Sequence, residues 1–322
     1  MTDLNDPNSE RLRHRHRPSL LFHGPGRIKA WDKQLLSAIR LIVAERREDL
    51  NLSKLDGITV TFNLHTALNE IAGRNDLVMA RKKRTLSQSY SVTAGCVFGV
   101  MRGERYLSHV ILDAAFLTQL VDDPQTEGLA ANIVAHELAH VGLSHWLIKP
   151  AQSYVFPTQR PDWRYEVLRY LTLSVWDEYG ACRLSARFGD SLAVTLNFMN
   201  CLRAKTVDGL PKLWLYTRKN WHLPSALTTF VNAAATARRP LLSAAYLMGH
   251  IDGLGVPMDV ATLCTAARIS PLNTCWTPLR DVLRGVWSWQ ADEFGFEALD
   301  GLVPVLMEAI RICGGGRMIT GI

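Results

Sequence analysis

The stretch LAANIVAHELAHVGLSHWL, residues 129–147, decides most about the fold of this chain. It has the length and apolar composition of a buried helix, and it contains the pattern His136-Glu137-Leu138-Ala139-His140. On a helix, positions four apart project to the same side, so His136 and His140 can bind one metal ion. Glu137 then lies beside the metal, where its carboxylate can take a proton from a bound water. The alternative is a helix with two buried histidines.

The segments around this helix predict its structural setting. Asp122-Asp123-Pro124 is a suitable helix start, and the helix is expected to end near His145. The spacing of apolar residues predicts an amphipathic helix at 31–48 and a second long helix at 162–188. Three prolines predict a loop at 149–161. Segments rich in β-branched residues predict strands at 58–64, 90–101 and 105–112, with a turn at 102–104. The expected fold class is α+β, with a small antiparallel or mixed sheet packed on two long helices and a mainly α-helical C-terminal region.

The chain divides by composition into three parts. Residues 1–26 are expected to be a disordered basic tail that ends at Gly24-Pro25-Gly26. Residues 27–205 contain the metal-binding helix and form the expected catalytic domain. Residues 206–322 are expected to be a separate helical domain. Its predicted helices are 225–237, 241–251, 258–267, 279–289 and 302–312.

Charge and cysteine usage limit the functional classes. The net charge is +6, and much of the excess lies in two basic runs, at 11–17 and 81–84, which could hold phosphates. Neither run has interleaved aromatic residues, so solvated basic segments are favoured over a nucleic-acid surface. The six cysteines form no CxxC pair, which argues against a disulfide framework or a zinc ribbon. With no apolar membrane span or secretory signal, a cytoplasmic protein is expected.

A catalytic zinc ion needs a third protein ligand besides the two histidines. Glu178 is the favoured ligand, because it lies in an apolar helix where a carboxylate is costly unless something neutralises it. Its neighbour Asp177 is the rival, and the alternative is that both carboxylates face water at a helix edge. His145 is disfavoured, because on a continuous helix it points about 140° away from His140.

The pairing of His136-Glu137-Leu138-Ala139-His140 with the later Glu178-Tyr179-Gly180-Ala181 resembles the gluzincin metallopeptidases. The short catalytic core and the trailing His145 resemble the ImmA/IrrE family in particular, over roughly residues 30–190. This resemblance implies one Zn²⁺ per chain, held by His136, His140 and Glu178, with Glu137 as the general base. It implies a gluzincin-like packing of the sheet on the metal helices. It also implies a zinc-dependent endopeptidase for a protein substrate, commonly a DNA-binding transcriptional repressor in a stress or mobile-element response.

The resemblance leaves three features open. Gluzincins usually place an Asp four residues after the ligand Glu, where this chain has Cys182; the thiol could support a ligand histidine, touch the metal, or simply pack. The oxyanion-stabilising group could be His109, Tyr154, Tyr165 or Tyr179. A substrate could pair as an added strand with residues 105–112.

By the same analogy, residues 206–322 would form a regulatory or recruitment domain. The alternative function is a nucleic-acid or protein binding module with a non-catalytic metal site, that is, a pseudo-peptidase. Direct nucleic-acid binding is not favoured, and no membrane partner is expected.

Overall fold

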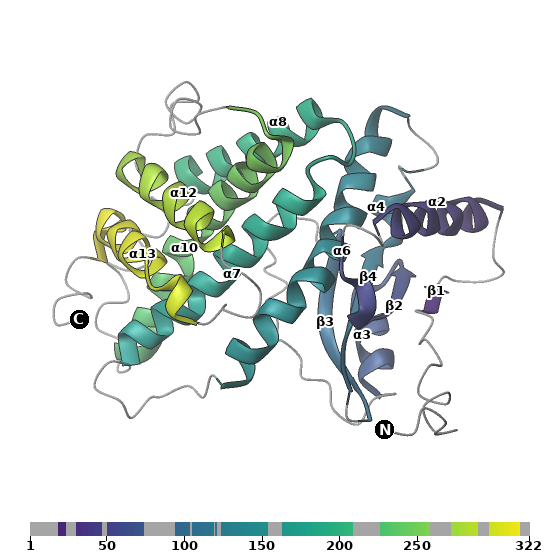
Figure 1. The fold of residues 1–322 in the computed structure, drawn as a ribbon, viewed down its shortest axis with the longest axis horizontal. Coiled ribbons are helices and arrows are strands. Elements are labelled where there is room, and N and C mark those ends of the chain that lie inside the picture. Colours follow the sequence, from purple (N-terminus) through teal and green to yellow (C-terminus); the bar gives the residue numbers. More distant parts are fainter. Residues whose placement is uncertain are drawn as a thin grey trace, which may run out of the picture.

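The computed structural model describes residues 19–23, 30–46, 50–73, 94–103, 105–118, 120, 124–153, 163–208, 226–257, 272–288 and 296–315. A small sheet lies at one side of the molecule and the C-terminal helices lie at the other (Figure 1). Two long helices, α6 (Pro124–Ser153) and α7 (Trp163–Ser185), lie between them. The expected mixture of a small sheet and many helices is confirmed. None of the described helices is both long and apolar enough to cross a bilayer.

The sheet has four strands in the order β1-β2-β4-β3. Strands β1 (Ser19–His23), β2 (Leu55–Thr61) and β4 (Arg105–Asp113) are parallel, and β3 (Gly95–Arg102) is antiparallel to β4. The sheet is therefore mixed. The β3–β4 hairpin turns at Gly103, whose φ of 61° lies in the left-handed region that glycine adopts without strain.

Two expectations about strands are wrong. Residues 19–23 fall in the predicted disordered tail, yet they form β1, because this apolar run can add its backbone hydrogen bonds to the open side of β2. A substrate cannot pair with residues 105–112 as considered above, because β4 pairs with β2 on one side and β3 on the other. Among the described strands, β1 and β3 form the edges of the sheet.

The two long helices begin close to the predicted positions. Helix α6 starts at Pro124, where the missing amide hydrogen costs nothing because the first turn has no intrahelical partner for it. Instead of ending near His145, α6 continues to Ser153, so the first part of the expected loop at 149–161 is helical. Helix α7 confirms the predicted helix at 162–188, although it ends slightly earlier, at Ser185.

Most of the remaining described structure is helical. Helix α2 (Ala30–Arg46) confirms the amphipathic helix, whereas α3 (Leu64–Gly73), α4 (Ala114–Leu117) and α8 (Ser191–Arg203) were not foreseen. In the C-terminal half, α12 is Asn273–Trp287 and α13 is Leu302–Ile310, close to two predicted helices. Short 3₁₀ turns at Leu52–Lys54 and Phe296–Leu299 and π turns at Ala204–Asp208 and Arg311–Gly315 complete the described elements.

The helices predicted at 225–237 and 241–251 are one helix, α10 (Ala226–Leu254), which continues through Pro240. A proline inside a helix removes one backbone hydrogen bond and usually ends or kinks it. Here Ala237, Leu241 and Ala244 are fully or nearly fully buried around the proline, so tertiary packing outweighs the local cost. The helix predicted at 258–267 lies outside the described residues.

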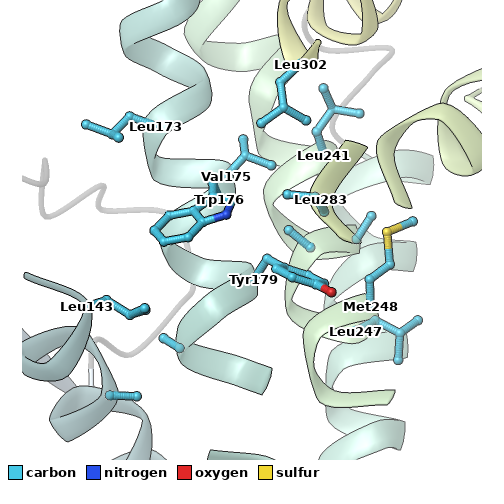
Figure 2. Close-up of a cluster of buried hydrophobic side chains, with 14 of the residues drawn as sticks. Leu143, Leu173, Val175, Trp176, Tyr179, Leu241, Leu247, Met248, Leu283 and Leu302 are labelled. Atoms are coloured by element: carbon cyan, nitrogen blue, oxygen red, sulfur yellow. The ribbon is translucent and has the colours of Figure 1, made fainter. Parts of the chain in front are cut away.

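A single apolar core extends from the sheet through α6 and α7 to the C-terminal helices. Figure 2 shows part of this core, where Tyr179 of α7 lies on the side that faces Leu241 and Met248 of α10 and Leu283 of α12. A second, smaller cluster lies on the opposite face of the sheet, beneath α3. Helix α7 is therefore packed against α6 on one side and against α10 on the other.

Candidate metal centre

Three side chains from α6 and α7 converge on one point. His136 Nε2 lies 3.1 Å from Oε2 of Glu178 and 3.1 Å from Nε2 of His140, and His140 Nε2 lies 3.3 Å from the same Glu178 oxygen. One potential ligand atom from each residue lies within 4.8 Å of the other two. His140 and Glu178 are buried, and His136 is 14% exposed at its side chain. The three residues predicted as ligands are thus brought together.

Two antiparallel helices produce this arrangement. Asn132, in the first half of α6, donates to the carbonyl oxygens of Ser185, the last residue of α7, and of Phe188 beyond it, while His140 contacts Asp177, earlier in α7. The small residue Gly180 allows the close approach, because a Cβ there would lie 2.9 Å from the Leu143 side chain. The ligands therefore face one another across a helix interface that small and apolar residues bring together.

The outer nitrogen of each ligand histidine has its own partner. His140 Nδ1 lies 3.0 Å from Oδ1 of Asp177, and His136 Nδ1 lies 3.6 Å from Sγ of Cys182. The carboxylate of Asp177 can only accept, so the hydrogen lies on Nδ1 of His140 and Nε2 is left free to bind a metal. The thiol of Cys182 can donate or accept weakly, so it contacts the His136 ring without fixing its tautomer. Asp177, considered as a rival ligand, supports His140 instead.

The sequence contained a signal for this role of Asp177. Both Asp177 and Glu178 are buried on an apolar helix, so each carboxylate needs its own compensation. One metal site explains only one of them.

The electrostatics favour a cation. Burial lowers the pKa of His140, but the carboxylates of Asp177 and Glu178 outweigh burial and raise it to about 10. The negative charges that stabilise a proton on His140 therefore also attract a metal ion. Burial, and then the charges of Glu178 and Glu137, raise the pKa of the Cys182 thiol well above its usual value. The Sγ atom of Cys182 lies on the Nδ1 side of His136 and is not among the three clustered ligand atoms, so Cys182 is placed to support His136 rather than to bind the metal.

Glu137 is buried between α6 and the edge strand β3. A Cβ on Gly95 would lie 2.7 Å from Cγ of Glu137, so glycine makes room for this side chain. Its Oε2 atom is buried and has no hydrogen-bond partner among the described residues. A buried carboxylate oxygen needs a partner, and a water held by a metal between His136, His140 and Glu178 would supply one. The residues present therefore fit a zinc ion with an open water position.

Among the four residues considered as oxyanion donors, His109 lies away from the metal centre. His109 and Val110 are consecutive on β4, so their side chains point to opposite faces of the sheet. Val110 belongs to the main core, on the α6 side, and His109 therefore lies on the face that α3 covers. There its ring contacts Asp56 at 2.7 Å and Thr59 at 2.9 Å.

The tyrosines are also placed elsewhere. Tyr165 lies beside Asp300 and about 20 Å along α7 from Glu178. Tyr179 donates its hydroxyl to Asp252, 2.7 Å away on α10. Tyr154 lies outside the described residues.

Sequence reasoning missed one aromatic residue beside the metal centre. The ring of Tyr246, half-buried on α10, packs edge-on against His136 with 6.1 Å between ring centroids and 82° between ring planes. Tyr246 carries no motif and lies far from the other site residues in the sequence, so only the tertiary structure reveals it.

Comparison with known proteins gives no further guide to this site. No protein-family model matches the chain, and neither a curated protein nor a solved structure shows significant similarity to it. The functional assignment therefore depends on the geometry of the metal centre itself.

Proposed function

We propose that this protein is a zinc-dependent endopeptidase of the gluzincin type. One observation carries the proposal: His136, His140 and Glu178 form an open three-ligand cluster beside the buried, unpartnered carboxylate oxygen of Glu137. A structural zinc site normally has four protein ligands, often cysteines. Cys182 lies on the Nδ1 side of His136 and is not part of the described three-residue cluster, which favours a catalytic site.

The chain's residues have distinct roles in the proposed reaction. When bound, zinc would lower the pKa of a water to about 7 and polarise the substrate carbonyl. Glu137 accepts a proton from the attacking water through its free Oε2 and then donates it to the leaving amine nitrogen. Asp177 holds His140 in the tautomer that keeps Nε2 available.

An extended protein segment is the proposed substrate. Strand β3 has a free edge among the described strands, and its first residue, Gly95, touches Glu137. A peptide added antiparallel or parallel to this edge would bring its backbone carbonyls close to the general base. The resemblance to ImmA/IrrE peptidases adds the proposal that the substrate is a DNA-binding repressor in a stress or mobile-element response.

The test compares wild type with Glu137→Gln and with Glu127→Gln, which makes the same change at an exposed position of α6. Zinc content is measured first, and each protein is then incubated with denatured protein substrates, with new amino termini identified by mass spectrometry. We expect one zinc in all three proteins and cleavage in all but Glu137→Gln. Undiminished cleavage by Glu137→Gln would falsify the proposed mechanism.

The alternative of a nucleic-acid or peptide binding module makes a different prediction. It requires binding without cleavage by the zinc-loaded wild type. The basic runs at 11–17 and 81–84, which suggested nucleic acid, lie outside the described residues. No contact in the described part of the chain favours this alternative over the peptidase.

A further inference from the structure

The two ligand histidines are held by groups of very different strength. His140 Nδ1 faces the carboxylate of Asp177 at 3.0 Å, a strong acceptor. His136 Nδ1 faces the sulfur of Cys182 at 3.6 Å, and sulfur is a weak hydrogen-bond acceptor. The orientation of the His136 ring therefore depends on additional contacts.

The additional contact comes from the C-terminal half of the chain. Tyr246 of α10 packs edge-on against the His136 ring, and it also packs against Phe198 of α8, with 5.7 Å between those ring centroids. Edge-to-face packing favours one relative orientation of two rings. Tyr246 is thus placed to restrict rotation of the weakly held ligand.

Helix α10 can bring Tyr246 to this position because it lies directly against α7. A Cβ on Gly249 would collide with the carbonyl oxygen of Tyr179, and one on Gly253 would collide with that of Arg183. Glycines one turn apart on α10 therefore allow backbone contact along the segment of α7 that bears Glu178 and Cys182.

Polar contacts secure the same interface. Asp252 accepts from the Tyr179 hydroxyl at 2.7 Å and pairs with Arg284 of α12 at 2.5 Å. Arg183 lies over the ring of Trp287, 4.9 Å from its centroid. Helices α7, α10 and α12 are consequently joined directly beside the ligand Glu178.

We propose that Tyr246 is a positioning residue for the metal ligand His136, and that α10 is thereby a structural part of the metal centre. Tyr246 replaces, by packing, the orientation that a carboxylate at position 182 would provide by hydrogen bonding. The inference rests on the metal binding in the proposed function, but it does not require peptidase activity. It also gives the C-terminal half a role at the site besides any regulation or recruitment.

The experiment measures the zinc dissociation constant of the full chain by competition with a chromogenic chelator. Tyr246→Phe keeps the ring and should bind zinc within about twofold of wild type, because the hydroxyl is not required for the edge contact. Tyr246→Leu removes the ring and should weaken binding about tenfold, as is typical when a ligand loses its supporting partner. The absorption spectrum of bound cobalt should show an altered metal coordination geometry in Tyr246→Leu but not in Tyr246→Phe.

Two further variants separate positioning from general stability. Phe230→Leu removes another buried aromatic ring from α10, one that packs on Trp163, about 24 Å along the helix from Tyr246. It should leave zinc affinity unchanged. In Tyr246→Leu, the added change Cys182→Asp places a carboxylate beside His136 Nδ1 and should restore zinc affinity to within about threefold of wild type.

Each outcome decides the inference. It is overturned if Tyr246→Leu binds zinc as tightly as wild type, if Phe230→Leu weakens binding equally, or if Cys182→Asp brings no rescue. A wild type that binds zinc without cleaving protein would contradict the proposed peptidase and leave the positioning role intact. A wild type that binds no zinc would overturn both.

Discussion

The carboxylate of Asp177 lies 3.0 Å from Nδ1 of His140, while the adjacent residue, Glu178, faces Nε2 of the same ring at 3.3 Å. One helix thus provides, through consecutive residues, both a candidate ligand and the support of another candidate ligand. Because successive helical positions differ by about 100°, the two carboxylates reach opposite sides of one imidazole.

Replacing Asp177 tests the value of that support. We expect Asp177→Asn to weaken zinc binding by about tenfold, because the amide oxygen still accepts a hydrogen bond but without charge, and Asp177→Ala by up to about a hundredfold. Isothermal titration with zinc in a chelating buffer would give both values. Equal affinities for wild type and Asp177→Ala would show that the contact with His140 does not matter for metal binding.

Gly95 should govern activity without affecting the metal. In Gly95→Ala the new methyl group displaces Glu137, whose Cγ lies only 2.7 Å from the Cβ position. We expect kcat for proteolysis to fall about tenfold or more, since small misplacements of a catalytic group are costly. Zinc content should stay at one ion per chain, because the atoms nearest to a Cβ at Gly95 belong to Glu137 and Leu112 rather than to a candidate ligand. Loss of zinc together with activity would contradict this separation.

The contact of α10 with α7 should tolerate no side chain at Gly249. The change Gly249→Ala forces a methyl group against the carbonyl of Tyr179, so we expect unfolding in urea to become easier by about 1–3 kcal/mol. Gly285→Ala on α12 is the matched control, because a Cβ there meets nothing within 4 Å. That control should be neutral or stabilising by up to about 1 kcal/mol, as alanine is the better helix former. Similar destabilisation of both variants would rule out the proposed close contact.

Acid stability should depend on a buried ion pair in the sheet. Burial by itself raises the pKa of Asp56, but hydrogen bonds from His109 and Arg102 outweigh it and hold that pKa well below its usual value. A lowered pKa in the folded state contributes stability above the unfolded value of about 3.9. That contribution is lost as the pH falls through the folded pKa.

The corresponding measurement is the free energy of unfolding at pH 5 and at pH 3. Asp56→Asn should be less stable than wild type at pH 5 and should lose less stability between the two pH values. Asp281→Asn, at an exposed residue of α12, is the control and should follow wild type. If Asp56→Asn keeps the full acid dependence, the pair with His109 and Arg102 is not its source.

Local periodicity and local chemistry were sufficient for much of the site. The four-residue separation of His136 and His140 brings their rings together on any helix, and Pro124 marks the start of that helix. The cost of carboxylates on an apolar helix pointed to both Asp177 and Glu178, and the structure places Glu178 in the cluster. The hairpin turn at Gly103 could likewise be predicted from the residue type. In each case the interaction that decides the outcome joins residues that are neighbours in the sequence or on one helix.

The tertiary structure alone decided the rest. Strand order makes β3 an edge and buries β4, and strand alternation places His109 on the face of the sheet away from α6. Tertiary packing keeps α10 helical on both sides of Pro240 and places Tyr246 beside His136. These outcomes depend on which apolar faces bury one another across long stretches of chain. Periodicity within one segment specifies that a face is apolar, but not which partner covers it.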